Sequence, residues 1–426
     1  MRTAIRLAAF KVAGGLAVVV MHGLLVRQIG EQDYGYFALF QTCFLVLATL
    51  TNGGWMHGIV LMISRYGLRK RWERFRGALI QANLVAILLS VAVAIPIYLM
   101  TPLIFSDPAQ IAAFRLGLAV VPFQAVIMVS KGVFRGLHMP LSSILPDEVA
   151  LPIVTIAIFA VFTVGGFWEA CLAYAIATAV ICVLSVIWAW ISVPDEVRAA
   201  RPSYVTRAWN AYTMPLIAGE AGNVIISRGD IIMLSALSTP EQTAHYAMGV
   251  RLGATLMLGQ SLILPLYGGR FSAARIERDH AKSRQLLVEA SLMASGLALV
   301  PALVLIIYPQ IATLVFGDAA NNALWPIRII AMAYFFHTAT GPLALFAQMQ
   351  GKHRVYSIIA IAAAFVNIAL NFVLVPKYGA VGAACTTLAV FAVWKGLLIY
   401  QLFTAWRNEL IGPPGERKQV DDADVK

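Results

Sequence analysis

The residues of this sequence that could do chemistry are charged side chains inside apolar stretches. Residues 211–236 make an apolar run long enough to cross a bilayer, and this run contains Glu220, Arg228 and Asp230. A charge at the centre of a span costs roughly 2.5–3.5 kcal/mol, so three charges cost about 9 kcal/mol. The eight strongly apolar residues of the run return only about 4 kcal/mol in total. The run therefore needs a polar interior to face.

The types of these charges point to the transport of a charged molecule. Arginine suits bidentate contact with phosphate, and a carboxylate inside a span can take up a proton or sodium. On a helix, Arg228 lies about 80° to one side of Glu220 and Asp230 lies about 80° to the other, with Glu220 about 14 Å deep. We therefore expect Arg228 to bind substrate and Glu220 and Asp230 to couple an ion. The alternative is a structural role for Arg228 and Asp230, paired with neighbours or extended toward the interface.

Further basic residues lie inside other apolar runs. Arg251 and Lys395 lie too deep in their runs to reach the interface easily, so both are candidate substrate-binding residues. For Arg251 the alternative is an ion pair with Glu220 or Asp230. Lys11 is a further candidate, although it lies only four residues inside its run and its side chain could extend to the interface.

Two histidines and a glycine turn complete the candidate residues. His22 and His57 lie in the first two runs and are candidate substrate contacts, although a membrane histidine is more often a buried hydrogen-bond donor. Asn52, Gly53 and Gly54 interrupt the second run. This interruption is a candidate hinge for alternating access, and the alternative is a kink that improves packing.

Membrane-spanning helices must position these residues, because the composition is that of a polytopic membrane protein. Of the 426 residues, 60% are hydrophobic and 12% are charged, whereas a soluble domain has about 25% charged residues. The alternating segments of a membrane β-barrel are not seen in the sequence. The four cysteines lie in apolar runs without a CxxC pair, which predicts small core residues. Twelve runs are expected to span, at about 7–27, 36–63, 78–100, 109–131, 142–164, 168–192, 211–236, 244–269, 286–308, 326–349, 356–375 and 379–404.

The distribution of lysine and arginine predicts the orientation. Segments on one side of the twelve runs hold 25 of the 32 basic residues, and segments on the opposite side hold 4. The positive-inside rule then predicts an even number of spans with both termini in the cytoplasm. These loops also explain the net charge of +11, so nucleic acid is not an expected partner. Membrane lipids are expected partners of the basic cluster between residues 65 and 76.

Short segments recur in the same order in both halves. EQDYGYFA at 31 pairs with EQTAHYAM at 241, and LIFSDPA at 103 pairs with LVFGDAA at 314. The offsets of 210 and 211 residues indicate a duplication, although chance matches between membrane loops are the alternative. The predicted fold is all-α, with two like-oriented six-helix bundles related by a pseudo-two-fold axis along the membrane normal. The expected divisions are an N-terminal bundle at 1–192, a cytoplasmic linker at 193–210, a C-terminal bundle at 211–410 and a disordered tail at 411–426.

Several of these segments resemble a known family. LVRQIGEQDYGYFALFQ at 25–41, RGDIIMLSALSTPEQTAHYAM at 228–248 and VPKYGAVGAACTTLA at 375–389 are similar to blocks of Wzx-type polysaccharide flippases. These flippases belong to the MOP superfamily, which also includes MATE drug exporters and MurJ-like lipid II flippases. The sequence departs from the family at the turn of the second span, where Thr51–Gly54 replaces an Asp-Leu-Gly-like turn.

The resemblance implies a protein of the bacterial inner membrane. Its expected activity is to move a polyprenyl-pyrophosphate-linked oligosaccharide from the cytoplasmic to the periplasmic face by alternating access, for lipopolysaccharide or other surface polysaccharide. Lipid-linked glycan, polysaccharide polymerase and glycosyltransferases are the expected partners. No bound cofactor or metal is expected, and the chain is not expected to be an enzyme, because no GxxxxGK[ST], GxSxG, HExxH or CxxC motif occurs.

Two other functions remain open from the sequence. A MATE-like, cation-coupled exporter of small cationic amphiphiles would line its cavity with surplus acid rather than surplus base. A membrane glycan polymerase or ligase would be expected to carry a large periplasmic loop. The longest connection in this sequence lies near 193–210 on the cytoplasmic side, which disfavours such an enzyme.

Overall fold

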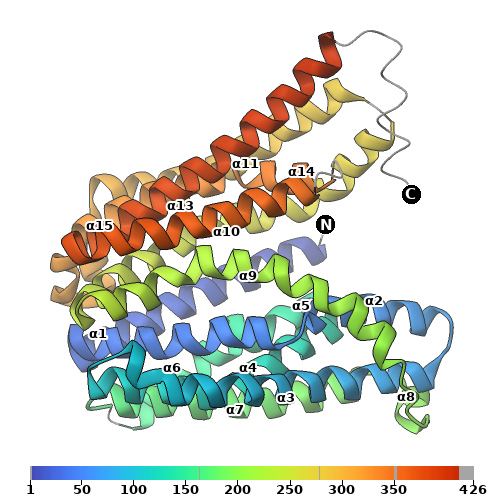
Figure 1. Cartoon of the computed structure of the whole chain (residues 1–426), viewed down its shortest axis with the longest axis horizontal. Coiled ribbons are helices and arrows are strands. Elements are labelled where there is room, and N and C mark those ends of the chain that lie inside the picture. Colours follow the sequence, from blue (N-terminus) through green and yellow to red (C-terminus); the bar gives the residue numbers. More distant parts are fainter. Residues whose placement is uncertain (1, 163, 278, 350–352, 412–426) are drawn as a thin grey trace.

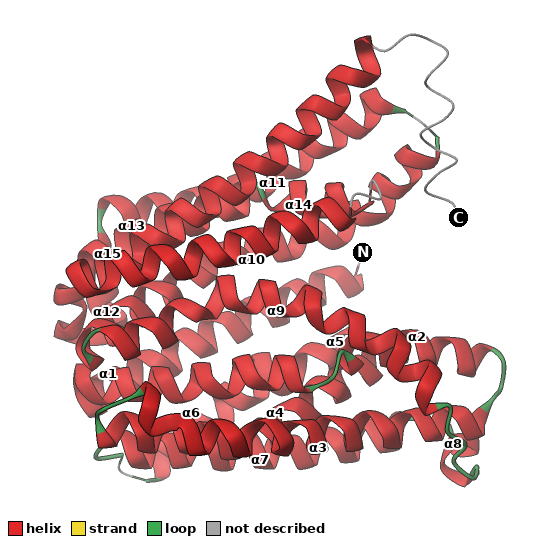
Figure 2. Ribbon diagram, in the orientation of Figure 1, coloured by secondary structure: helices red, strands yellow, loops and turns green. Residues whose placement is uncertain are grey.

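A computed structural model describes residues 2–162, 164–277, 279–349 and 353–411. All the regular secondary structure in these ranges is helical (Figure 2). The predicted tail falls almost entirely outside the described residues, because the last described helix ends at Ile411.

The first part of the chain forms helices that follow one another with short connections. In order these are α1 (Arg2–Thr51), α2 (Trp55–Leu68), α3 (Trp72–Ile104), α4 (Pro108–Gly136), α5 (Pro140–Ile144), the π-helix η1 (Leu145–Ala150), α6 (Leu151–Val161) and α7 (Phe167–Ser192). A short helix, α8 (Asp195–Ala199), lies in the connection to the second part.

The second part has the same helical character. It comprises α9 (Thr206–Leu237), α10 (Pro240–Ile276), α11 (His280–Ile307), the 3₁₀ helix η2 (Pro309–Ala312), α12 (Thr313–Phe316), the 3₁₀ helix η3 (Gly317–Ala323), α13 (Leu324–Ala339), α14 (Gly341–Met349) and α15 (His353–Ile411).

Nine of the helices in the described ranges are long and apolar enough to cross a membrane. Two of the longest, α1 and α15, each contain a glycine with non-helical backbone angles, Gly30 at φ 81° and Gly379 at φ 53°. A positive φ is open to glycine and breaks a helix. Figure 1 shows the blue chain of α1 running to one end of the molecule and then doubling back. The helix α9, with its three charges, is not among the nine.

The outer faces of these helices present large apolar side chains. Leu103 of α3, Val300 of α11 and Phe365 of α15 are all exposed in the isolated chain. Such surfaces are stable in the hydrocarbon of a bilayer, where the helix satisfies its own backbone polar groups. The chain is therefore a multi-pass membrane protein.

The helices lie in two groups (Figure 1). The blue to green helices α2 to α7 lie together on one side, and the yellow to red helices α10 to α15 lie together on the other. Between them, α1 packs against both α4 and α10, and α9 packs against both α2 and α15. The yellow to red group leans away from the other group toward the end where α8 lies.

We name the two ends of the molecule by what they contain. The Gly30 end holds Gly30, the turn before α4, the turn before α10 and Gly379, and the opposite end, with α8, is the linker end. The two groups touch closely at the Gly30 end, where Gly35 of α1 abuts Pro240 of α10 so tightly that a Cβ at Gly35 would overlap the Pro240 carbonyl. The same end is held by Gln110, which donates to the carbonyl of Ser235 at 2.9 Å.

The connection between the groups is fastened at the linker end. Arg76 of α3 donates to the carbonyl oxygens of Arg198 at 2.6 Å and Ala200 at 2.7 Å. The backbone N–H of Ser203 donates to the carbonyl of Glu73 at 3.0 Å. These bonds tie α8 and the following residues to the first group, so that α9 starts from a fixed position beside α2.

Candidate functional site

The helix α9 begins against the first group of helices and ends in the second. Its start lies on α2, where Gly58 leaves no space between α2 and the side chain of Thr213. Trp209 of α9 donates from its indole N–H to the hydroxyl of Tyr66 at 2.8 Å. Its later turns lie against α15. The three charges of α9 therefore lie where the helix passes from one group to the other.

The close contact at Gly58 gives a first prediction. Gly58→Ala adds a Cβ that would overlap the Thr213 methyl group, so α9 must shift at a cost of about 1–3 kcal/mol. We expect a lower thermal unfolding midpoint for the purified protein in detergent. Gly296→Ala is the matched control, because nothing lies within 4 Å of a Cβ there. Equal midpoints for the two variants would show that α9 is not packed on α2 in this way.

The predicted hinge at Asn52, Gly53 and Gly54 is a turn between α1 and α2. Gly53 and Gly54 have φ values of 64° and 71°, which suit glycine. The amide nitrogen of Asn52 donates to the Thr49 carbonyl at 2.5 Å, and its oxygen accepts from the N–H of Met56 at 3.4 Å. The side chain thus links the end of α1 to the start of α2. The helix is interrupted as expected, and the hinge role stays a prediction.

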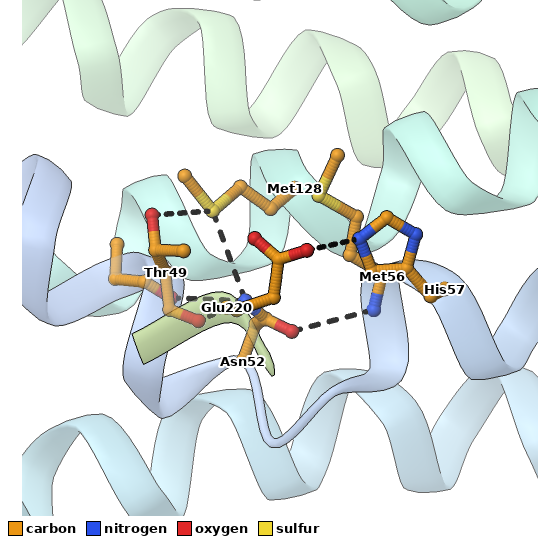
Figure 3. A network of polar contacts seen from close by, with 7 residues as sticks. Thr49, Asn52, Met56, His57, Met128 and Glu220 are labelled. Carbon is orange, nitrogen blue, oxygen red and sulfur yellow. Dashed lines mark hydrogen bonds and ion pairs between the residues drawn. The ribbon is translucent and has the colours of Figure 1, made fainter. Parts of the chain in front are cut away.

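The carboxylate of Glu220 contacts the imidazole of His57. The two lie 3.0 Å apart, from Oε1 to Nε2, and Figure 3 shows the Glu220 carboxylate directed at the His57 ring beside the Asn52 turn. Their side chains are 34% and 43% exposed, so the pair lies in an open part of the structure. Two residues that the sequence suggested for different roles therefore form one acid–base pair between α9 and α2.

Asp230 is buried and accepts four hydrogen bonds. Its Oδ1 accepts from the amides of Asn367 at 2.8 Å and Asn371 at 2.6 Å, and its Oδ2 accepts from the hydroxyls of Tyr246 at 2.7 Å and Thr387 at 2.8 Å. All four donors are neutral and come from α10 and α15. A carboxylate held by neutral oxygen- and nitrogen-bearing side chains can take up a proton or a hard cation.

A second cluster contains three of the predicted basic residues. The charges of Arg228 and Arg251 lie close enough to act on each other and on His22. His22 is fully buried, with its Nδ1 3.0 Å from the Tyr34 hydroxyl. Arg251 donates to the side-chain oxygen of Gln41 on α1. The cluster thus joins α1 to α9 and α10.

The nitrogen atoms of this cluster are incompletely bonded. Three of its nitrogen atoms are buried and have no hydrogen-bond partner in the described structure. These are Nε2 of His22, Nη1 of Arg228 and Nε of Arg251. Neither arginine is paired with an acid among the described residues. Since buried donors and charges are normally paired, the cluster has unused capacity to bind an anion.

The other predicted basic residues lie elsewhere. Lys395 is buried in α15 against the ring of Trp394, and Lys11 is half-buried in α1 near Glu148 of η1. The structure therefore joins His22, Arg228 and Arg251, while Lys395, Lys11 and His57 each belong to a different set of contacts.

A polar contact at the Gly30 end was missed by the sequence analysis. Glu31 of α1 contacts Nε2 of His245 on α10 at 2.6 Å, and accepts from the amide of Asn322 in η3 at 3.0 Å. Nearby, Arg27 donates to the carbonyls of Leu314 at 2.6 Å and Thr313 at 3.3 Å. The repeated EQ segments at 31 and 241 contain or adjoin both Glu31 and His245, and this was the available signal.

Comparison with known families decides the identity of the chain. A family model described as polysaccharide biosynthesis protein matches residues 2–271. The chain belongs to this family. A comparison with curated proteins gives no match.

Solved structures of transporters and of a lipid flippase have a similar fold. An inward-facing multidrug resistance MATE family transporter of the MOP superfamily is 16% identical, covers 96% of each chain and has a TM-score of 0.70. The lipid II flippase MurJ in an inward closed conformation is 13% identical, with 94% of this chain and 87% of MurJ covered and a TM-score of 0.70. A MOP superfamily transporter from Pyrococcus furiosus is 15% identical, with 95% of each chain covered and a TM-score of 0.62. The family match and this fold confirm the resemblance found in the sequence.

Proposed function

We propose that this polysaccharide biosynthesis protein is a flippase for a polyprenyl-pyrophosphate-linked oligosaccharide. It moves the glycan head across the bacterial inner membrane by alternating access, for lipopolysaccharide or another surface polysaccharide. The observation that carries the proposal is the cluster of Arg228, Arg251 and His22, which has buried nitrogen atoms without hydrogen-bond partners and no acid partner in the described residues.

A pyrophosphate fits the chemistry of this cluster. Two guanidinium groups can each bind phosphate oxygens through two N–H groups, and they do so most strongly where water is excluded. The lipid tail of the substrate can stay in the bilayer, while its charged head cannot cross about 30 Å of hydrocarbon without such compensation. Because the cluster spans α1, α9 and α10, a bound head would be held between the two groups of helices.

The helices and the charges support a proposed arrangement of twelve spans in the membrane. Counting α1 and α15 as two spans each and adding α9 to the nine apolar helices gives twelve spans. The linker end carries most of the basic residues and lies in the cytoplasm with both termini. Residues 1–192 and 211–410 then form two like-oriented bundles of six, joined by 193–210.

The basic segment at the linker end would contact anionic lipid headgroups of the cytoplasmic leaflet. A pocket of about 650 Å³ lies there, and Lys70, Arg71 and Arg74 line it together with Trp72. Lysine and arginine near a membrane surface gain about 1 kcal/mol each from anionic lipid. The same position suits contact with polymerase or glycosyltransferase partners.

Two acids are candidates for coupling an ion gradient to transport. Glu220 shares its position with His57, so a proton arriving at either group changes the link between α9 and α2. Asp230 follows Glu220 by ten residues, which is about 15 Å along α9, and lies in the buried network of neutral donors. A MATE-like exporter of cations would also use such acids, but two arginines without an acid partner among the described residues would repel a cation and disfavour that alternative.

The contacts of Glu31 would keep the periplasmic side shut in this conformation. Glu31→Ala removes the shared partner of His245 and Asn322, so we expect the Gly30 end to open more often. The measurement is the rate at which a cysteine placed at Ser235, which is buried at the same end, reacts with a membrane-impermeant thiol reagent, in a Cys385→Ser background because Cys385 is exposed. We expect faster labelling in Glu31→Ala than with Glu31 present.

Gln110→Ala is a control for that experiment, because it removes one interhelical bond at the same end without touching Glu31. If Glu31→Ala and Gln110→Ala label at the same rate as the parent, Glu31 does not hold the two groups together.

The function itself is tested by complementation. The gene is expressed in a bacterial strain that lacks its own lipid-linked oligosaccharide flippase, and surface polysaccharide is measured. Restored polysaccharide supports the proposal. Accumulation of the protein in the membrane without restored polysaccharide, for a panel of strains with different glycans, would contradict it.

A further inference from the structure

Lys395 is a buried cation that the proposed transport path does not use. Its side chain lies in α15 with 1% of its surface exposed. Its Nζ lies 4.7 Å from the centre of the Trp394 ring, and it makes no hydrogen bond or ion pair with the described residues. A cation–π contact is worth about 0.5–2 kcal/mol, which is less than the cost of removing an ammonium ion from water.

Two more polar atoms in the same place lack partners. The indole N–H of Trp394 and Nδ1 of His337 on α13 are both buried without a hydrogen bond in the described structure. The His337 and Trp394 rings lie 6.0 Å apart between centroids, and the charge of Lys395 is close enough to act on His337. Three polar groups with unused hydrogen-bonding capacity in the described structure therefore lie close together.

The neighbours of these three groups are aromatic. Phe391 lies 4.4 Å from His337 between ring centroids, and Tyr356 lies 6.1 Å from Trp394. Phe391, Trp394 and Lys395 are each at most 5% exposed. The side chains of Trp394 and Lys395 are therefore shielded from solvent.

The chemistry of the three groups selects an anion. An ammonium group and an indole N–H only donate hydrogen bonds, and an imidazole can donate as well. A ligand that satisfies all three must accept several hydrogen bonds and carry negative charge to compensate the lysine. A halide or a small oxyanion such as formate has these properties.

We propose that Lys395, Trp394 and His337 form a binding site for a small free anion inside the second group of helices. The site is separate from the Arg228 and Arg251 cluster. It is also separate from Asp230, because Lys395 follows Thr387 by eight residues, which is about 12 Å along α15. Folding of the second group, and hence transport, then depends on the anion present.

The test measures the unfolding midpoint of the purified full-length protein in detergent. Gluconate, a large organic anion, is replaced by chloride or by formate at constant ionic strength. For the protein with Lys395 we expect a saturable rise in the midpoint with either small anion, because a ligand that binds only the folded state stabilises it. The absence of any rise would overturn the proposal.

Lys395→Met supplies a sharper test, because methionine keeps the length of the side chain and removes the charge. We expect Lys395→Met to unfold at a higher midpoint than the parent in gluconate, since an uncompensated buried charge has been removed, and to lose the anion-dependent rise. A Lys395→Met protein that keeps the full rise would overturn the proposal.

Two other variants keep the proposal falsifiable. Trp394→Phe removes the indole N–H but keeps an aromatic ring, so we expect a smaller rise and a higher anion concentration at half-saturation. Arg115→Met lies in the first group of helices, outside both basic clusters, and is expected to keep the rise. Loss of the rise in Arg115→Met, or an unchanged rise in Trp394→Phe, would overturn the Lys395 site without affecting the proposed flippase function.

Discussion

Replacing either Arg228 or Arg251 with glutamine is expected to abolish transport while the protein still accumulates in the membrane. Glutamine keeps a polar side chain of similar length but removes the charge that would compensate a phosphate. A hydrogen bond to a charged group contributes about 1.5–3 kcal/mol, which corresponds to roughly 10- to 150-fold in binding. We expect surface polysaccharide in the complemented strain to fall to the level without the flippase.

Arg115→Gln is the matched control for these variants. Arg115 of α4 also lies within an apolar helix, but its guanidinium lies 4.3 Å from the Tyr98 ring, outside the cluster. We expect this variant to restore polysaccharide as the parent does. Normal polysaccharide in both Arg228→Gln and Arg251→Gln would show that the cluster does not bind the pyrophosphate.

The second large effect is expected at Asp230, and it should differ between two substitutions. Asp230→Ala leaves Tyr246, Asn367, Asn371 and Thr387 without their common acceptor, and each buried unpaired group costs about 1–3 kcal/mol. We expect little folded protein in the membrane. The measurement is the amount and unfolding midpoint of the purified variant.

Asp230→Asn separates folding from coupling. The asparagine oxygen can still accept from two of the four donors, so we expect folded protein in nearly normal amount. The negative charge is lost, and with it the capacity to take up a proton or a cation. Transport by Asp230→Asn in proteoliposomes should no longer respond to an imposed proton or sodium gradient. A response equal to that of the parent would remove Asp230 from the coupling mechanism.

Sequence patterns were sufficient to find the unusual helix. Three charges in residues 211–236 exceed what an isolated span tolerates, and the structure places this segment between the two groups of helices, where α9 packs against α2 and α15. The same reasoning singled out Arg251, because a deep arginine needs a polar environment whichever helix carries it. Its proximity to Arg228 and His22 agrees with that expectation.

The partners of these charges could not be predicted in the same way. Asn367, Asn371 and Thr387 come from α15, more than 130 residues after Asp230 in the chain. Helical periodicity gives the face on which a residue lies but not which distant helix packs against that face. For the same reason the sequence grouped Lys395 with the arginines, whereas the structure gives it aromatic neighbours on α13 and α15.

The contact of Glu31 with His245 illustrates a different limit. Both residues lie near the ends of apolar runs, where charged side chains are common and normally contact water. Only the close approach of α1 to α10 at the Gly30 end brings Oε2 of Glu31 within 2.6 Å of Nε2 of His245. That approach depends on Gly35, whose missing side chain admits Pro240.

The most direct test of the central claim is transport by the purified protein. Proteoliposomes are prepared with a fluorescent polyprenyl-pyrophosphate-linked oligosaccharide, and a membrane-impermeant glycosidase reports the fraction of glycan on the outer face over time. We predict that the protein makes the inner-leaflet glycan accessible, and that the Arg228→Gln, Arg251→Gln double variant behaves as empty liposomes do. Equal accessibility with the double variant and with the unmodified protein would contradict the role of the arginine cluster, and no transport by the unmodified protein of any such glycan would contradict the flippase function.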